Sequence, residues 1–381
     1  MNLNDSQLLV RDLAREFTND VIRPLVTELD QSERYPDDLY RRMGELGLFG
    51  ICVPEALGGA GLDTLSYTLV MEELARGYAS VADQCGLVEL ITTLLVSHGT
   101  PDQQNAWLTG IMTSQIRVAY CITESEAGSD VSGIRTTAVR QGDDWILNGG
   151  KLWIHNAPVA DLGFVLARTN PEAGHRGMSI FVVDLTGEGV TRGSREHKMG
   201  QRASPVGALH FDNVKLPSNA LLGDENQGFY MMMNVLDKGR VGIAALAVGI
   251  AQAGMEAALD YAGERKQFKQ HIIDFQGLQW MLADMAKELK AARLLVREAA
   301  RLIDQGENAT MTCSMAKCFA TDMAVKCTSD AVQVFGGSGY IRGFEVERLY
   351  RDAKITQIYE GTNQIQRTII ARELMKHGAC S

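Results

Sequence analysis

The chain has 381 residues, of which 45% are hydrophobic and 22% charged, a composition typical of a globular protein with a large apolar core. Its formal net charge of -10 argues against nucleic acid as the main partner, because no long basic stripe is available to neutralise phosphates. The seven cysteines form no CxxC pair, which favours reduced, buried thiols over disulfides or a metal site (Cys52, Cys85, Cys121, Cys313, Cys318, Cys327 and Cys380).

The N-terminal part of the chain is helical in period. Met1 to Asp5 leads directly into an amphipathic pattern, so it does not read as a signal peptide. The apolar spacing predicts one long helix over 8–29, and further helices over 37–46, 65–75, 81–97 and from Pro101 onward. No apolar run is expected to be long enough to span a bilayer. We therefore expect a cytoplasmic protein with no membrane partner, or one in a matrix-like compartment if a transit peptide has been removed.

The pattern changes near Arg117 and changes back near Gly228. Short alternating strands over 145–147, 163–167 and 178–183, separated by Gly, Asn and Asp turns, predict a small antiparallel β-domain. Long helical patterns over 231–264, 275–303 and 310–334 then predict an antiparallel bundle. The expected fold is α+β and multidomain, packed as one unit. It comprises an N-terminal α-helical domain (1–116), a middle antiparallel β-barrel-like domain (117–227) and a C-terminal four-helix bundle (228–381).

A lone carboxylate near the C-terminus is the strongest catalytic candidate. Glu360 stands beside Tyr359 and Gly361, just ahead of an apolar helical pattern over 365–375. A carboxylate at a helix start is suited to proton abstraction, and its backbone N–H can point at a developing oxyanion. The ordinary alternative is a solvated surface Glu. Together with the run Gln-Val-Phe-Gly-Gly-Ser-Gly-Tyr over 333–340, the segment resembles the C-terminal signature of the acyl-CoA dehydrogenases, in which this Glu is the catalytic base.

The order of helices, β-domain and helical bundle is similar to the fold of that family over essentially the whole chain. The resemblance implies FAD held between the β-domain and the bundle, an acyl-CoA substrate and an electron-transferring flavoprotein as the acceptor. It also implies a homotetramer built as a dimer of dimers. The implied reaction is α,β-dehydrogenation of a short-chain acyl-CoA to the trans-2-enoyl-CoA, in which Glu360 takes the α-proton and flavin N5 takes the β-hydride.

Two segments of the β-domain resemble the family's flavin motifs. The turn after the first strand offers backbone N–H groups, although a plain surface turn is the alternative. Trp153 would lie along the flavin edge, or else belong to the β-domain core. His155 stands where the family usually has Thr or Ser near flavin N5; it can supply an N–H donor, but it is bulky and titratable, and a packing role is equally open. The cofactor contacts implied here are Tyr120, Ile122, Thr123, Gly128, Ser129, Trp153 and His155, with Ser129 also near the substrate.

Two segments of the bundle carry the rest of the implied flavin site. An Arg at a helix end can clamp a pyrophosphate, or merely complement the helix dipole. Lys269 replaces the family's usual Gly, so we expect the loop backbone there to differ or to avoid positive φ. The Gly-rich helix end would approach the adenosine half of a neighbouring subunit's flavin, so holding FAD implies at least a dimer. The implied contacts are Arg265, Gln267, Phe268 and Gln276, then Gln333, Gly336, Gly337, Thr362 and Gln364.

The acyl-CoA contacts are implied by two further stretches. The run Asp237 to Arg240, expected to open a long helix, matches family residues that contact the acyl-CoA and support the Glu360 loop, although a plain ion pair is compatible. Tyr359 and Gly361 flank the base. Glu89 interrupts an apolar helix expected to line the acyl pocket, so it is either at the surface, paired with a protein cation, or aimed at a polar or cationic acyl tail.

Two other interpretations stay open at this point. The same flavin site could serve elimination or enoyl-CoA reduction, which His155 and the polar residues of the pocket would support. A non-catalytic assembly protein on the same fold is the third interpretation, and the spread of flavin motifs over several segments counts against it.

Overall fold

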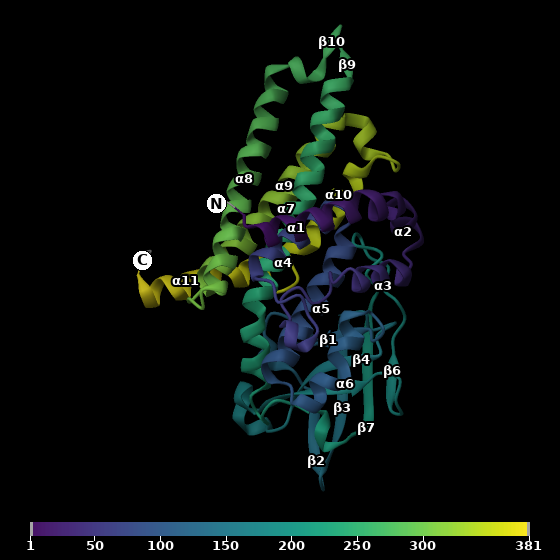
Figure 1. Ribbon diagram of the computed structural model, residues 1–381, viewed down its shortest axis with the longest axis vertical. Coiled ribbons are helices and arrows are strands. Elements are labelled where there is room, and N and C mark those ends of the chain that lie inside the picture. Colours follow the sequence, from purple (N-terminus) through teal and green to yellow (C-terminus); the bar gives the residue numbers. More distant parts are fainter. Residues whose placement is uncertain (1–2, 379–381) are drawn as a thin grey trace.

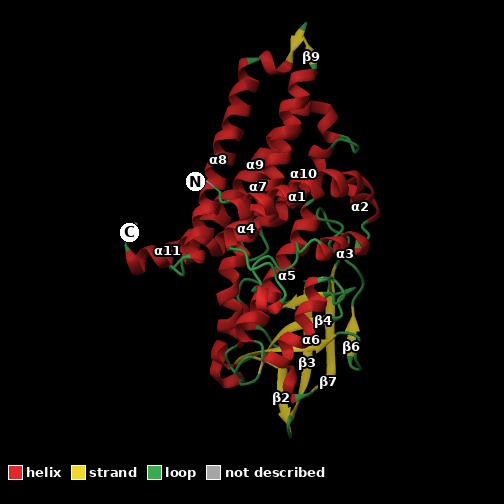
Figure 2. Cartoon of the chain, in the orientation of Figure 1, coloured by secondary structure: helices red, strands yellow, loops and turns green. Residues whose placement is uncertain are grey.

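The N-terminal helices come first in the computed structural model, which describes residues 3–378 (Figures 1 and 2). They are α1 (Asp5–Phe17), α2 (Val26–Ser32), α3 (Asp37–Glu45), α4 (Thr64–Gly77), α5 (Ala79–His98) and α6 (Pro101–Met112). The prediction of one helix over 8–29 was wrong. A π-helical turn (Thr18–Ile22) and a 3-10 turn (Arg23–Leu25) separate α1 from α2, because Pro24 has no N–H to donate and its ring clashes with the carbonyl one turn earlier.

One sheet forms the middle of the chain. Its strands are β1 (Val118–Cys121), β2 (Thr137–Gln141), β3 (Asp144–His155), β4 (Leu162–Arg168), β5 (Met178–Asp184), β6 (Val190–Arg192), β7 (Val206–Leu216) and β8 (Leu221–Leu222). The order is β6-β7-β3-β2-β4-β5-β8, with β1 paired to β4. The sheet is not wholly antiparallel as predicted: β1 runs parallel to β4, and β2 meets β4 in one parallel pair. The strand β1 enters from α6 and not from a hairpin, so it is free to run parallel.

The C-terminal helices are α7 (Gly228–Glu264), α8 (Gln276–Asp304), α9 (Thr310–Phe335), α10 (Glu345–Lys354) and α11 (Asn363–His377). A two-stranded hairpin of β9 (Lys266–Gln267) and β10 (Gln270–His271) joins α7 to α8. The run Asp237 to Arg240 does not open a helix. It lies inside α7, because buried Met231, Met232 and Val235 extend the apolar helical period upstream of it.

The molecule is elongated, and its two ends have different character (Figure 1). The β9–β10 hairpin stands at one end of the long axis, and the sheet lies at the other, with α1 to α5 packed between them. One large apolar core joins these helices to the bundle and to one face of the sheet. A second core inside the β-domain is built around Trp145 and Phe181, whose rings meet edge to face at 5.2 Å.

Two helices correct the expectation that no apolar run could span a bilayer. By length and composition alone, α5 and α7 are long and apolar enough. In each of them, 78% of the most apolar window is buried inside the protein. Burial among their own neighbours explains this apolarity, since core helices pass the same test.

Candidate functional site

The Glu360 loop has a strained backbone held by two side chains. Glu360 has φ of 52° and Gly361 has φ of 86°, and a non-glycine residue adopts such a conformation only at a cost. Lys317 of α9 donates from Nζ to the Gly361 carbonyl at 2.8 Å. The Gln366 side chain of α11 donates to the carbonyls of Glu360 at 3.2 Å and Gly361 at 3.0 Å. Thr362 caps α11 by accepting from the Ile365 N–H. The loop is therefore fixed from two helices.

The Glu360 carboxylate points into the protein. Its Oε2 atom is buried and has no hydrogen-bond partner in the described part of the chain. A Cβ built on Gly239 of α7 would lie 3.0 Å from Oε2, so the carboxylate fits against the bare face of a helix. Burial raises the pKa of Glu360 to about 7; the Arg240 and Lys317 charges lower it and Asp83 raises it further. A carboxyl group with this pKa is suited to accept a proton near neutral pH.

Arg240 supports the loop through its charge. Its Nη1 pairs with Asp237 at 2.6 Å, and the Thr310 hydroxyl donates to the other Asp237 oxygen at 2.7 Å. Arg240 makes no hydrogen bond to Glu360, yet it is the strongest influence lowering that pKa. The ion pair and the electrostatic support occur together. Tyr359 turns inward, with its hydroxyl accepting from the Gln201 side chain at 3.2 Å.

The two β-domain motifs meet at a bulge. The Leu152 N–H donates to the Thr123 carbonyl at 2.9 Å. The pairing of β3 with β7 shifts between Lys151 and Ile154, and Trp153 has φ of 54°. The Trp153 side chain is 65% exposed, so it does not belong to the β-domain core. The bulge therefore presents a flat apolar face outward, beside the turn that carries Thr123.

The neighbouring residues of the first motif also fit a ligand-binding turn. Ser129 is exposed, and a Cβ on Gly128 would meet nothing. The Ile122 carbonyl accepts from the buried Lys151 ammonium at 2.9 Å. Burial raises the pKa of Tyr120 well above its usual range, and the Glu360 charge raises it further. The first motif therefore senses the charge of the candidate base.

His155 is buried and paired with a carboxylate from α5. Its Nδ1 lies 3.2 Å from Asp83, and its Nε2 is buried without a partner among the described residues. Burial lowers the pKa of His155, opposed by Asp83, and the neighbouring Asp83 carboxylate favours the ring proton on Nδ1. The expectation that His155 supplies an N–H donor to the flavin stays a prediction.

The remaining cofactor candidates gather at the far end of the bundle, near the β9–β10 hairpin (Figure 1). The Tyr261 and Phe335 rings stack at 4.1 Å and join the ends of α7 and α9 there. A Cβ on Gly336 or Gly337 would meet nothing, which leaves room for a close ligand. These exposed candidates do not join Trp153 and Glu360 within one chain: Arg265, Gln267, Phe268, Gln276, Gln333, Gly336 and Gly337. Thr362 and the exposed Gln364 start α11, beside the Glu360 loop.

The loop at Lys269 corrects another expectation. Phe268 has φ of 49° and Lys269 has φ of 67°, so the backbone keeps positive φ although no glycine is present. They are the two central residues of the β9–β10 hairpin, where the tightest turns require positive φ at both positions.

Glu89 is buried and forms an ion pair. Its carboxylate lies 2.6 Å from the Lys238 ammonium, and Lys238 also reaches the Thr93 hydroxyl at 3.4 Å. Of the three possibilities for Glu89, pairing with a protein cation is the one observed. Lys238 and Asp237 also line a cavity of about 470 Å³ between α5, α7 and the α8–α9 connection.

Three functional groups were missed from the sequence. Gly239 makes room for the base, Lys317 fixes its loop, and Asp83 orients His155. Gly239 lay inside a quoted motif, and a glycine in mid-helix is a signal of close approach. Lys317 and Asp83 gave no such signal, because their partners are distant in sequence.

The six described cysteines are free, and Cys380 lies outside the described residues. Across residues 3–378, no group of three His, Cys, Asp or Glu side chains could hold a metal ion.

A buried base against a helix, an exposed tryptophan and a glycine turn are compatible with a flavin-dependent oxidoreductase. Sequence models of the acyl-CoA dehydrogenase family match the chain over residues 4–115 (N-terminal domain), 119–214 (middle domain) and 226–375 (C-terminal domain). The chain therefore belongs to the acyl-CoA dehydrogenase family, and its cofactor is FAD. The exposed face of Trp153, the unpartnered Nε2 of His155 and the open space at Gly336 fit a flavin nucleotide.

Individual relatives include both dehydrogenases and a reductase. The chain is 42% identical to the caffeyl-CoA reductase-Etf complex subunit CarC of Acetobacterium woodii, over 99% of this chain and 100% of that protein. It is also 42% identical to an acyl-CoA dehydrogenase of Bacillus subtilis, over 98% of this chain and 99% of that protein. The solved structure of butyryl-CoA dehydrogenase from Megasphaera elsdenii superposes with a TM-score of 0.96 at 38% identity, covering 98% of this chain and 99% of that one.

Proposed function

We propose that the protein dehydrogenates a short-chain acyl-CoA to the trans-2-enoyl-CoA, with Glu360 removing the α-proton. The observation that carries the proposal is the buried Glu360 carboxylate, which has one unpartnered oxygen and a pKa of about 7. FAD, when bound, supplies the two-electron acceptor for the β-hydride. The Glu360 N–H makes no backbone hydrogen bond among the described residues, so it is free to stabilise the thioester oxygen as negative charge develops there.

The residues around the Glu360 site support a short apolar acyl chain as the substrate. The Glu89–Lys238 pair neutralises the one buried carboxylate on the α5 wall, and Leu90 approaches the Gly239–Glu360 contact. An apolar, straight or branched short acyl chain suits this surface better than a cationic tail, because the tail would compete with Lys238. Tyr359, Gly361, Ser129, Asp237 and Arg240 are the proposed substrate contacts around it.

The test is anaerobic bleaching of the flavin by a panel of saturated acyl-CoAs. We expect the short straight and branched thioesters to bleach the FAD-loaded protein. Glu360→Gln should slow bleaching by roughly 10²–10⁴-fold, the usual contribution of a general base, while leaving the flavin spectrum in place. If no saturated thioester bleaches the flavin, or if Glu360→Gln bleaches at the normal rate, this function is wrong.

Enoyl-CoA reduction is the second candidate, and the name of one relative is the observation that favours it. With its proton held by Asp83, His155 presents an acceptor at Nε2. An acceptor beside flavin N5, where the family places this residue, would favour the reduced flavin that carries a proton there. This contact would raise the flavin potential and make the reduced flavin a weaker hydride donor, so by itself it favours the oxidative direction. One relative of 42% identity is named as the subunit of a caffeyl-CoA reductase complex. His155→Thr should then lower the flavin midpoint potential, measured by spectroelectrochemistry. An unchanged potential would show that His155 does not act on the flavin.

The proposed partners are an electron-transferring flavoprotein and further copies of this chain. An Etf complex appears in the name of a close relative. The cofactor candidates form two groups in separate parts of the molecule, one of them near the β9–β10 hairpin. In that group Phe268 is 88% exposed, and Tyr340, which follows Gly336 and Gly337, is 85% exposed. A second copy covering these rings would bring the two groups together, in keeping with a homotetramer as a dimer of dimers. Mass photometry at working concentration tests the tetramer. We place the protein in the cytoplasm, where free thiols persist.

A further inference from the structure

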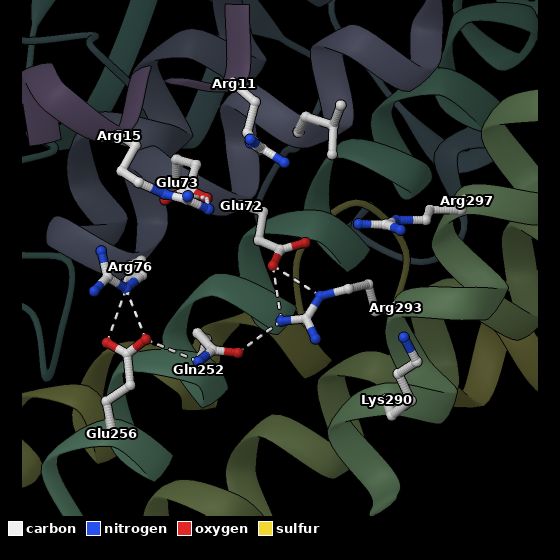
Figure 3. A pocket seen from close by; sticks show the side chains of 11 residues that line it. Arg11, Arg15, Glu72, Glu73, Arg76, Gln252, Glu256, Lys290, Arg293 and Arg297 are labelled. Carbon is white, nitrogen blue, oxygen red and sulfur yellow. Dashed lines mark hydrogen bonds and ion pairs between the residues drawn. The ribbon is translucent and has the colours of Figure 1, made fainter. Parts of the chain in front are cut away.

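A charged cavity of about 500 Å³ lies between α1, α4, α7 and α8, separate from the Glu360 site (Figure 3). Three carboxylates line it, together with six cationic side chains: Arg11, Arg15, Arg76, Lys290, Arg293 and Arg297. This excess of positive charge is unusual for a chain whose formal net charge is -10. The volume is within the range of small-molecule sites.

Each carboxylate of the cavity forms an ion pair, although one buried oxygen of Glu73, Oε2, has no hydrogen-bond partner among the described residues. Glu72 pairs with Arg293 at 2.8 Å, Glu73 with Arg15 at 2.6 Å, and Glu256 with Arg76 at 2.8 Å (Glu72 and Glu256 with their partners in Figure 3). Arg11 is bound by Asp12, at 2.6 Å, which does not line the cavity.

Two cations of α8 stay without a counter-charge. Lys290 and Arg297 form no ion pair with any carboxylate in the described part of the chain, and Arg297 Nε is buried without a hydrogen-bond partner. Figure 3 shows both side chains projecting from the same helix as Arg293. The cavity therefore holds donors and positive charge that the described part of the chain does not satisfy.

The helix bears an energetic cost for this arrangement. Lys290, Arg293 and Arg297 are spaced i, i+3 and i+7, so they lie on one face of α8. Like charges at such spacings destabilise a helix, and only Arg293 forms a salt bridge with a carboxylate that offsets it. A bound anion would remove the repulsion and satisfy the buried Nε donor.

The arrangement of the cations selects the kind of anion. Arg297 and Lys290 approach from α8 and Arg11 from α1, on different sides of the space (Figure 3). A single carboxylate is satisfied by one bidentate guanidinium, whereas a phosphate group carries more charge and offers oxygens in several directions. We propose that this cavity is a second ligand site, which binds a phosphate-type polyanion such as a diphosphate group.

Titration calorimetry with inorganic pyrophosphate tests the proposal on the FAD-loaded protein. Sodium chloride at matched ionic strength is the reference. We expect saturable binding of one pyrophosphate per chain, and a melting temperature that rises with pyrophosphate by linkage. Arg297→Gln should weaken binding at least about tenfold. Lys287→Gln is the matched control, because Lys287 stands on the same helix, pairs with Asp284 and does not line the cavity.

Lys290→Met is a second test variant, for the case that Arg297→Gln folds poorly. Without pyrophosphate, this variant should melt no lower than the parent, because it removes a repulsive charge. With pyrophosphate, its melting temperature should rise by less than that of the parent. Either of two outcomes overturns the proposal. Sodium chloride could raise the melting temperature as much as pyrophosphate does, or the pyrophosphate affinity could be unchanged in both variants. If the variants dissociate the assembly while pyrophosphate affinity is unchanged, the cavity is an interface between copies and the proposal is equally wrong.

Discussion

Gly239 and Glu360 meet across the α7 surface so closely that a side chain on Gly239 would have to share the space of the carboxylate. A Cβ there would lie 3.0 Å from Glu360 Oε2 and 3.5 Å from Leu90 Cδ1. We therefore expect Gly239→Ala to displace the carboxylate and slow substrate-driven flavin bleaching by about tenfold or more, equivalent to about 1.4 kcal/mol in the barrier.

Gly263→Ala is the control for this variant, since Gly263 lies on the same helix and its Cβ would meet nothing. Stopped-flow bleaching and a melting curve would be recorded for both. A Gly239→Ala protein that bleaches as fast as the control would contradict the close contact.

The pH dependence should distinguish the two proposed reactions. Burial raises the pKa of Glu360 to about 7. Dehydrogenation needs the ionised base, so its rate should rise as pH increases through about 7. Enoyl-CoA reduction needs Glu360 to donate a proton, so its rate should fall over the same interval. Single-turnover rates from pH 5.5 to 8.5, in both directions, check this; the same trend in both directions would exclude Glu360 as the proton carrier.

Glu360→Gln should stabilise the fold at alkaline pH. The folded protein binds the Glu360 proton more tightly than the unfolded chain does, so this group lowers stability as pH rises from about 4.5 through 7. The rise in pKa corresponds to roughly 3 kcal/mol as an upper estimate. Urea unfolding at pH 8 should favour the Gln variant, and the advantage should largely disappear at pH 5. An advantage that is the same at both pH values would show that ionisation is not its source.

Lys317→Met should disturb the loop and the base together. The change removes the donor to the Gly361 carbonyl, at a cost of about 1–3 kcal/mol. The Lys317 charge also lowers the Glu360 pKa, so its loss should move the rising limb of the dehydrogenation rate to higher pH. Lys326→Met, at a half-exposed position of the same helix, is the control. If the rising part of the pH–rate profile does not move, the Lys317 charge does not influence the base.

The Glu89–Lys238 pair should behave as one unit. Glu89→Met or Lys238→Met alone leaves a buried charge, and each should cost about 3–5 kcal/mol. The double variant should cost clearly less than the sum of the two, measured by urea unfolding. The acyl-CoA preference of the Glu89→Gln variant is a separate measurement. If the preference changes toward or away from polar acyl chains, Glu89 shapes specificity; if the preference is unchanged, Glu89 has only a structural role.

Much of the fold could be predicted from the sequence because its signals are local. The apolar periods of α4, α5, α8 and α9 and the strands β4 and β5 are written in neighbouring residues. The failures are also local in cause. Pro24 interrupted an apolar period that otherwise continued, and the Phe268–Lys269 turn adopted positive φ without glycine. The hairpin geometry overrode the residue preference there.

The site was only partly predictable because half of its geometry is tertiary. Glu360 was found from its motif, but the burial of its carboxylate could not be predicted from the sequence. The pairing of His155 with Asp83 depends on packing β3 against α5, which also joins Asn156 to Gln84 at 2.9 Å. The Glu89–Lys238 pair joins residues 149 positions apart. No periodicity in the sequence encodes such pairings.

The separation of the two groups of cofactor candidates has a practical consequence for handling the protein. Trp153 lies in β3 of the sheet, and Arg265 lies at the hairpin end of the molecule. If two copies complete each flavin site, as proposed, retention of the yellow colour depends on mass action between subunits. A sample that keeps its FAD at high protein concentration should lose it on strong dilution. Gel filtration of a dilute stock would then yield pale protein, and the colour should return when FAD is added and the protein is concentrated again.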